Sequence, residues 1–175
     1  MKKNLVLLSL FVLLFTVSMV FSMGAEAVKD LDIERYQGTW YEIGRYGLFF
    51  ENGLQNVTAE YELMDDGRIS VHNQGFYGGP DGLKSSINGT AYVPDASEPG
   101  KLLVRFFSAF ESDYWVIDID QENYAYAVVS TPSMNFLWIL SRTPQMSDEL
   151  YTTTIKKLDA WGFPVEKIQK VKQSW

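Results

Sequence analysis

The chain has 175 residues and a mass of 20.0 kDa, which is the size of one domain with a short appendage. It contains no Cys and a single His, His72, which excludes disulfide scaffolds and thiol catalysis and nearly excludes multi-His metal sites. A formal net charge of −7 disfavours nucleic acid as a partner, because nucleic-acid binding depends on basic surfaces. Aromatic residues make up 15% of the chain, which indicates that some of them line a cavity or a surface.

The beginning of the chain has the layout of a secretory signal. Lys2 and Lys3 form a positively charged start, residues 5–21 form a nearly unbroken apolar run, and a small-x-small triplet ends at Ala27. We expect cleavage after Ala27, so residues 1–27 are the signal peptide. Loss of two Lys and one Glu takes the formal charge from −7 to −8 in residues 28–175. An uncleaved membrane anchor is the alternative, because the apolar run is about as long as the shortest membrane span.

Export combined with the absence of Cys favours a bacterial location, the periplasm or the exterior, over an animal secretory pathway, in which disulfides are common. A lipid-anchored lipoprotein would need a Cys to acylate. The sequence therefore predicts an exported bacterial protein without a lipid anchor.

After the signal, the sequence predicts one helical turn and then a series of extended segments. Asp32 caps the turn at residues 32–36, and Gly38 ends it. Turn residues separate the extended segments, as in Asp65-Asp66-Gly67, where Gly can adopt the positive φ of a tight hairpin. The predicted strands cover residues 39–46, 56–63, 68–75, 84–93, 101–107, 113–119, 124–130 and 135–141. Eight consecutive strands predict an all-β fold, an eight-stranded antiparallel up-and-down barrel, because closure removes the exposed strand edges.

The last strands are apolar on both faces, so both faces need cover. In residues 113–119, Tyr114 and Val116 are expected on one face. The opposite face is expected to carry Trp115, Ile117 and Ile119. The cover is predicted to be one C-terminal α-helix packed outside the barrel, which Ser147 caps and Gly162 ends. Its apolar stripe contains Leu150, Ile155, Leu158 and Trp161.

Three segments resemble the signatures of the lipocalin family and follow one another in the family's order. Residues 38–43 (Gly-Thr-Trp-Tyr-Glu-Ile) resemble the Gly-x-Trp signature of the first strand. Residues 114–125 resemble the middle signature, and residues 137–144 (Leu-Trp-Ile-Leu-Ser-Arg-Thr-Pro) resemble the signature of the eighth strand. The resemblance is greatest for bacterial lipocalins and apolipoprotein D, and it implies that residues 28–175 form one lipocalin domain.

Two features depart from that group. Its bacterial members often carry a lipid-anchored Cys at the mature N-terminus, where this chain has Ser22-Met23-Gly24-Ala25. Asp118 stands where the group usually has a small or apolar residue. If Asp118 points inward, the pocket is more polar than those of the relatives.

Gly38, Trp40 and Arg142 are interpreted as structural residues. Gly38 allows the backbone to pass from a helical turn into a strand, and Trp40 is then a large plug at the closed end of the barrel. Arg142 can place its guanidinium across the indole, a contact worth about 1–2 kcal/mol when it is shielded from water. The resemblance implies that this pair seals the barrel floor.

The interior of an eight-stranded barrel has room for its own side chains or for one small ligand. Small residues among large rings favour a cavity over a filled core; they are Ala59, Gly89, Ala91, Ala125 and Ala127. The residues expected to bind the ligand are Tyr61, Leu102, Val104, Phe106, Tyr114, Val116 and Trp138. The resemblance places Tyr61 and Trp138 where related pockets are lined. The alternative interpretation is that all of these residues form an ordinary hydrophobic core without a ligand cavity.

Aromatic and aliphatic residues are also concentrated in the loops at the predicted mouth of the barrel, residues 47–53, 75–83, 108–112 and 131–134. The exposed candidates are Leu48, Phe49, Phe50, Phe76, Tyr77 and Phe110. Apolar loop tips form either a ligand portal or an interface. They allow contact with a membrane surface or a homodimer formed through the mouth loops.

The leading functional hypothesis is an exported lipocalin that binds and carries a small apolar ligand, a fatty acid or a lysophospholipid. The resemblance implies a role in lipid transport or maintenance of the cell envelope. One alternative is an interaction protein that uses the aromatic mouth loops. Another is a lipid- or pigment-modifying enzyme on the same barrel, which the absence of Cys disfavours. No catalytic residue, metal site or cofactor is predicted, and His72 is expected to face water.

Overall fold

The computed structural model describes residues 24–47, 51–107 and 110–174. The predicted signal of residues 1–27 lies almost entirely outside these ranges, as do the mouth-loop candidates Leu48, Phe49 and Phe50. Cleavage after Ala27 therefore stays a prediction.

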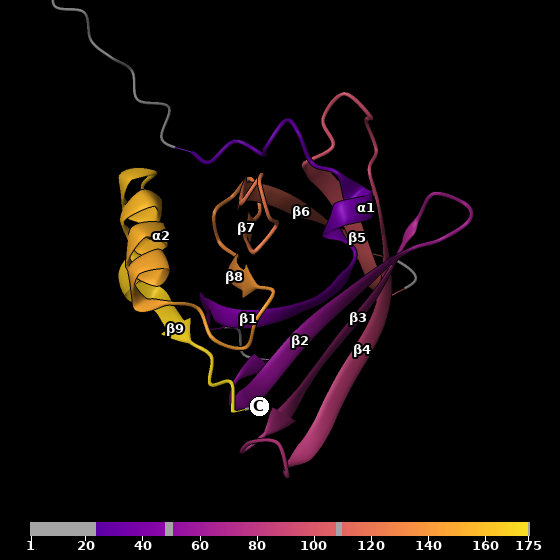
Figure 1. Ribbon diagram of the computed structural model, residues 1–175. Coiled ribbons are helices and arrows are strands. Elements are labelled where there is room, and N and C mark those ends of the chain that lie inside the picture. The colour runs from indigo at the N-terminus through magenta and orange to yellow at the C-terminus, as the bar shows by residue number, and fades with distance from the viewer. Residues whose placement is uncertain (1–23, 48–50, 108–109, 175) are drawn as a thin grey trace, which may run out of the picture.

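The strands form a closed antiparallel barrel, which confirms the predicted fold (Figure 1). Each strand pairs with the next along the chain, and the first strand pairs with both the eighth and the second. The elements are α1 (Ile33–Tyr36), β1 (Gly38–Tyr46), β2 (Leu54–Leu63), β3 (Ile69–Tyr77), β4 (Leu83–Tyr92), β5 (Lys101–Phe107), β6 (Phe110–Ile119), β7 (Tyr126–Ser130) and β8 (Leu137–Ser141).

Local turn chemistry explains where most strands begin and end. Gly67 has a φ of +80° in the β2–β3 hairpin, as predicted from its position after two Asp residues. The strand β7 begins two residues later than expected, because Tyr124 has a φ of +53° and its amide donates to the Asp120 carbonyl at 2.8 Å. The preceding turn therefore extends through Ala125.

The helix α2 (Asp148–Ala160) covers the outer face of the barrel beside β7 and β8, as predicted (Figure 1). The Ser147 hydroxyl accepts a hydrogen bond from the Leu150 amide at 3.2 Å, which caps the helix. Leu158 is fully buried in an outer apolar cluster that also includes Ile155 and Trp161. Tyr151, rather than the predicted Leu150, is the first helical residue in this cluster. None of the helices formed by the described residues has the length and hydrophobicity needed to span a bilayer.

A β-bulge in β6 reverses the predicted orientation of Ile119. The pairing of β6 with β7 shifts between Val116 and Asp118, so one extra residue is accommodated on β6. Ile117 packs in the outer cluster, whereas Ile119 returns to the inner cluster. The expectation that Ile117 and Ile119 share a face was therefore wrong, because strict alternation fails across a bulge.

The same bulge places Asp118 on the outer face of the barrel, under α2. Its carboxylate accepts hydrogen bonds from Lys157 Nζ at 2.7 Å and from the Tyr126 hydroxyl at 3.2 Å. The ion pair joins β6 to α2. Asp118 is therefore directed away from the barrel interior and does not make the interior more polar.

The C-terminal segment closes a seam that β1 and β2 leave open. These strands pair only where Gly38–Tyr41 face Thr58–Tyr61. The 3-10 helix η2 (Val165–Lys167) leads into a strand that the sequence did not predict, β9 (Ile168–Lys170), which pairs with β1. The Gln173 side-chain amide then donates to the carbonyls of Glu42 and Val57, at 2.9 Å each, and so links the two separated strands.

Candidate ligand-binding site

The closed end of the barrel is sealed by Trp40 and Arg142. Trp40 is fully buried, and the Arg142 guanidinium carbon lies 3.8 Å from the centre of its ring. The guanidinium also donates to three backbone carbonyls, those of Arg35 at 2.6 Å, Thr39 at 3.1 Å and Tyr124 at 3.3 Å. The predicted cation–π contact is therefore present, and Arg142 joins α1, β1 and the turn before β7.

Gly38 leaves space for this guanidinium. Its φ is +90°, a conformation that favours glycine, and a Cβ at this position would lie 3.4 Å from Arg142 Nη1. Both the backbone conformation and the close approach of Arg142 therefore explain a Gly at the first position of β1. A purely structural role for Gly38, Trp40 and Arg142 stays a prediction.

Three tyrosines form a layer above the plug. The Tyr114 hydroxyl lies 2.7 Å from that of Tyr36 and 2.8 Å from that of Tyr61, so the three groups share hydrogen bonds. The Tyr36 and Trp40 ring centres are 5.0 Å apart and the rings are tilted by 34°, so the layer lies in contact with the plug. Burial raises the pKa of Tyr61 to about 12 and the pKa values of the other two hydroxyls as well. These hydroxyls are neutral at physiological pH and satisfy one another.

All seven predicted ligand-binding residues lie in or against a single inner cluster. Leu102, Val104 and Val116 are buried within it, and Phe106 and Trp138 pack against it. Tyr61 and Tyr114 belong to the tyrosine layer near the closed end. The structure thus brings these residues together on the interior side, and ligand binding by them stays a prediction.

The small residues that were predicted to leave space inside the barrel differ in their positions. Ala91 and Ala127 are buried in the inner cluster. Ala125 is exposed in the turn before β7, so its predicted inward position was wrong. A Cβ on Gly89 would lie 2.7 Å from Cδ1 of Phe106, so the missing side chain at this position makes room for that ring. Gly89 therefore makes room for the Phe106 ring and does not by itself leave a cavity.

Sequence reasoning missed a buried cluster of charges inside the barrel, formed by Glu42, Arg45 and Glu51 and called here the charged triad. Glu42 pairs in register with Leu140 and Arg45 with Trp138, two residues of the inner face. Glu42 faces inward by alternation from Trp40, and the register shift between Glu42 and Gly44 turns Arg45 inward as well. Glu42 and Arg45 are each only 5% exposed.

The contacts of Arg45 tie the triad together. Its Nη1 donates to Glu42 Oε1 at 2.5 Å, and its Nε lies 3.8 Å from Glu51 Oε2. Its Nη2 donates to the backbone carbonyls of Glu51 at 2.6 Å and Leu54 at 3.2 Å. Because β1 and β2 do not pair at this level, Arg45 bridges their open ends from the inside.

Burial perturbs both carboxyl groups of the triad. It raises the pKa of Glu42 to about 7, and the nearby charge of Glu51 adds to this rise while Arg45 opposes it. Burial also raises the pKa of Glu51, against the opposing effects of Arg45 and of a hydrogen bond from the Trp138 side chain. Trp138, a predicted ligand-binding residue, is thereby in contact with the triad.

One signal in the sequence could have revealed part of the triad. With Trp40 facing inward as the plug, simple alternation places Glu42 on the same face. Alternation alone would then have directed Arg45 outward, because the register shift after Glu42 is invisible in the sequence. Two other carboxylates of β2, those of Glu60 and Glu62, are exposed. His72 lies on the outer side of β3, where Nδ1 is 2.5 Å from Asn88 Oδ1.

Large apolar side chains surround the open end of the barrel and are called here the aromatic rim. Phe110 is 77% exposed, and Tyr77 is also exposed, as predicted. Phe76 is half-buried. The other rim residues are Leu83, Phe107 and Phe136. The Phe136 ring stacks on Trp138 with centres 6.0 Å apart, so the rim continues into the interior.

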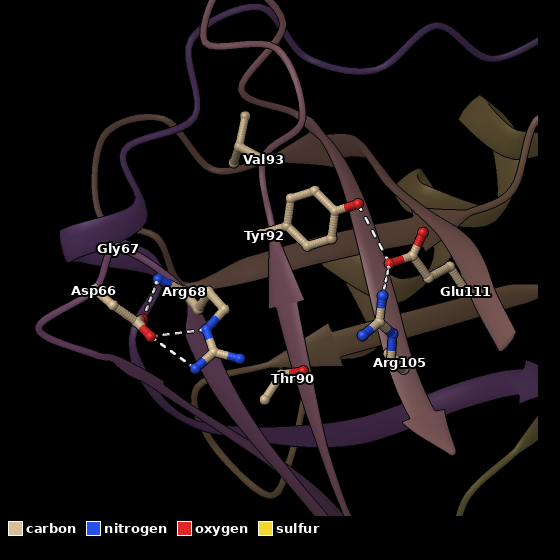
Figure 2. A pocket seen from close by; sticks show the side chains of 8 residues that line it. All are labelled: Asp66, Gly67, Arg68, Thr90, Tyr92, Val93, Arg105 and Glu111. Atoms are coloured by element: carbon tan, nitrogen blue, oxygen red, sulfur yellow. Dashed lines mark hydrogen bonds and ion pairs between the residues drawn. The ribbon is translucent and has the colours of Figure 1, made fainter. Parts of the chain in front are cut away.

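A groove of about 500 Å³ lies on the outer face of the barrel (Figure 2). Thr90 and Tyr92 flank the inward-facing Ala91, so the groove faces solvent rather than the interior. Its charges are paired locally: Arg68 Nη2 lies 2.7 Å from Asp66 Oδ2. Arg105 pairs with Glu111, which also accepts from Tyr92. The groove therefore presents compensated surface charges.

Comparisons with known proteins agree with this architecture. The family model of the lipocalin-like domain matches residues 31–173. The outer membrane lipoprotein Blc of Escherichia coli K12 is 43% identical over 151 residues, which cover 86% of this chain and 84% of Blc. Temperature-induced lipocalin-1 of Arabidopsis thaliana is 39% identical, covering 85% and 83% of the two chains. Mouse apolipoprotein D is 34% identical, covering 83% and 79%.

Solved structures agree with the fold at lower sequence identity. Insecticyanin from the tobacco hornworm Manduca sexta superposes with a TM-score of 0.67 at 23% identity, covering 86% of this chain and 85% of that one. Lobster apocrustacyanin A1 gives a TM-score of 0.66 at 16% identity, covering 89% and 94%. The barrel, its sealed floor and the sequence match over residues 31–173 show that this chain belongs to the lipocalin family.

Proposed function

We propose that this protein is an exported lipocalin that encloses one small apolar ligand, a fatty acid or a lysophospholipid, and carries it in the cell envelope. The observation that carries the proposal is the continuity between the exposed aromatic rim and the inner apolar cluster through Phe136 and Trp138. An acyl chain that enters at the rim would follow a path lined by apolar side chains.

The free energy of such binding comes from burial rather than from chemistry. Each buried methylene contributes roughly 0.8 kcal/mol, so a chain of about twelve supports micromolar or tighter binding after the cost of association. Membership of the lipocalin family favours carriage over catalysis, and we propose no enzymatic role.

Two observations support the proposed location in the envelope. The sequence begins with the layout of an export signal, and the relatives from E. coli and Vibrio cholerae are named outer membrane lipoproteins. The 175 residues contain no Cys to which a lipid could be attached. We therefore propose a location in the periplasm or outside the cell, without a lipid anchor.

Native mass spectrometry of the protein purified from its own envelope tests the proposal. We expect a population whose mass exceeds that of the protein by one fatty acid or one lysophospholipid, and whose excess is removed by delipidation. Recovery of a folded protein that neither carries lipid nor takes it up after delipidation would contradict the carrier function.

The exposed rim also supports a second candidate, an interaction protein. Phe107 and Phe110 are 69% and 77% exposed, which is costly for side chains that meet only water. A membrane surface or the mouth of a second copy could cover them. Concentration-dependent dimerisation that is abolished by Phe110→Ser, in a protein that binds no lipid, would favour this function over carriage.

A further inference from the structure

The balance of charge inside the barrel is uneven. The triad contains two carboxyl groups, Glu42 and Glu51, and one guanidinium, that of Arg45. With all three ionised, the net charge is −1 inside an otherwise apolar interior. A buried uncompensated charge is costly. A proton retained on a carboxyl group relieves it at low pH, in line with the raised pKa values of Glu42 and Glu51, and once both carboxyl groups are ionised a positive charge or a hydrogen-bond donor from outside the triad would stabilise the site.

The positions of the polar atoms indicate which partner is missing. Among the described residues, Arg45 makes four polar contacts through Nη1, Nη2 and Nε, so this side chain is largely committed to Glu42 and to the segment from Glu51 to Leu54. Of the two Glu51 carboxylate oxygens, Oε2 is buried and has no hydrogen-bond partner among the described residues, although Arg45 Nε lies 3.8 Å away. Asn73 Oδ1 is also buried without a hydrogen-bond partner among the described residues. Asn73 is the cross-strand partner of Ala59, which packs against the inner cluster. Both atoms are acceptors, so the unmet requirement is for donors.

The triad is also reachable from the open end. The Glu51 side chain is 17% exposed and precedes β2 at the mouth, whereas the Glu42 side chain, 7% exposed, lies deeper. Trp138 contacts the Glu51 carboxyl group on one side and stacks on Phe136 of the rim on the other. A head group held near Glu51 would therefore leave its acyl chain against the apolar wall.

We propose that the charged triad is a head-group subsite that favours single-chain amphiphiles bearing an ammonium group over those bearing a carboxylate. The inference rests on the proposed carrier function and narrows its ligand class. An ammonium supplies three donors and one positive charge, which complement the Glu51 oxygen that accepts no hydrogen bond and the net charge of the triad. A carboxylate in the same place would add a third negative group beside a single, already committed guanidinium.

Three probes with the same chain and different heads test the inference: dodecylammonium, 1-dodecanol and dodecanoate, each titrated calorimetrically into delipidated protein at pH 8. Their apolar burial is matched, so differences in affinity report the head group. We expect dodecylammonium to bind about tenfold more tightly than dodecanol, and dodecanoate about tenfold more weakly.

Two variants separate the triad from the general negative charge of the protein. Glu51→Gln removes one carboxylate and leaves Glu42 and Arg45 in a one-to-one pair, so the preference for ammonium should fall to within about threefold of the alcohol. Glu62→Gln removes one exposed carboxylate from the end of β2 and should leave the preference unchanged. Equal losses in the two variants would mean that long-range charge, and not the triad, sets the preference.

The outcomes also distinguish the inference from the function on which it rests. If dodecanol binds and all three head groups bind equally well, the head-group subsite is wrong and the carrier function stands. If none of the three probes binds to folded protein, the carrier function fails and the head-group inference fails with it.

Discussion

Glu42 and Arg45 form an ion pair inside the barrel, with Oε1 and Nη1 2.5 Å apart, although they are three residues apart on one strand. In a regular strand such residues point to opposite faces. The register shift between Glu42 and Gly44 adds one residue and returns Arg45 to the inner face. The pair is thus a consequence of the bulge.

The raised pKa of Glu42 predicts a stability that falls as the pH rises. Its pKa in the folded protein is about 7, above the ordinary value of 4.5, so folding favours the protonated form. The stabilisation is present below about pH 4.5 and is lost as the pH rises through about 7. Between pH 5 and 8 we expect Glu42 to contribute a loss of about 1–3 kcal/mol in the free energy of unfolding.

Urea denaturation of the wild type and of Glu42→Gln across this pH range isolates that contribution. The amide does not titrate, so the difference between the two proteins should change with pH and level off below about pH 4.5. A difference independent of pH would show that Glu42 titrates normally. Glu60→Gln, on an exposed position of β2, is the matched control and should follow the wild type.

Arg142→Ala is expected to destabilise the fold without changing ligand choice. The variant loses the cation–π contact with Trp40 and the three hydrogen bonds to backbone carbonyls, at a cost of about 1–3 kcal/mol. Urea midpoints and fatty-acid affinities would be measured for both proteins. Unchanged stability with lost binding would reverse the assignment of Arg142 as structural.

Trp138 is expected to report ligand entry. A C16–C18 fatty acid or a lysophospholipid should shift or quench tryptophan fluorescence saturably, at about one ligand per barrel, because the indole lies between the rim and the charged triad. Trp138→Phe should remove most of the signal and keep the fold, and Trp138→Ala should weaken binding by about 1–2 kcal/mol. The chain has five Trp, so the variant is needed to assign the signal. An unaltered titration in Trp138→Phe would place this side chain outside the pocket.

Asp118→Asn is expected to lower stability and to leave ligand affinity unchanged. Asp118 pairs with Lys157 of α2 on the outer face, and the Lys157 side chain is 43% exposed, so solvent screens the pair. A loss of about 1 kcal/mol or less is expected in the free energy of unfolding. The double variant with Lys157→Ala should lose little more stability, because both substitutions remove the same ion pair. Altered fatty-acid affinity in Asp118→Asn would contradict the outward placement of this side chain.

Cleavage of the predicted signal peptide is tested separately. N-terminal sequencing of protein extracted from the envelope should begin at Val28, the residue after the small-x-small triplet. Intact Met1 in washed membranes would restore the anchor hypothesis.

The sequence by itself determined the features that depend on neighbours along the chain. Alternating strands and hairpin residues specify the barrel, because each strand pairs with the next. The cap at Ser147 specifies the start of α2. The pairing of Trp40 with Arg142 links distant parts of the chain, and it was expected from the resemblance of residues 38–43 and 137–144 to the lipocalin signatures.

Only the tertiary structure decided which way residues point beyond a bulge and what fills the seam between β1 and β2. Ile119, Asp118 and Arg45 each follow a register shift, and that shift depends on the partner strand rather than on the residues themselves. Gln173 reaches the carbonyls of Glu42 and Val57 across more than a hundred residues of chain. The charged triad therefore depends both on a β-bulge in β1 and on contacts between segments far apart in the chain. Neither produces a periodic pattern in the sequence.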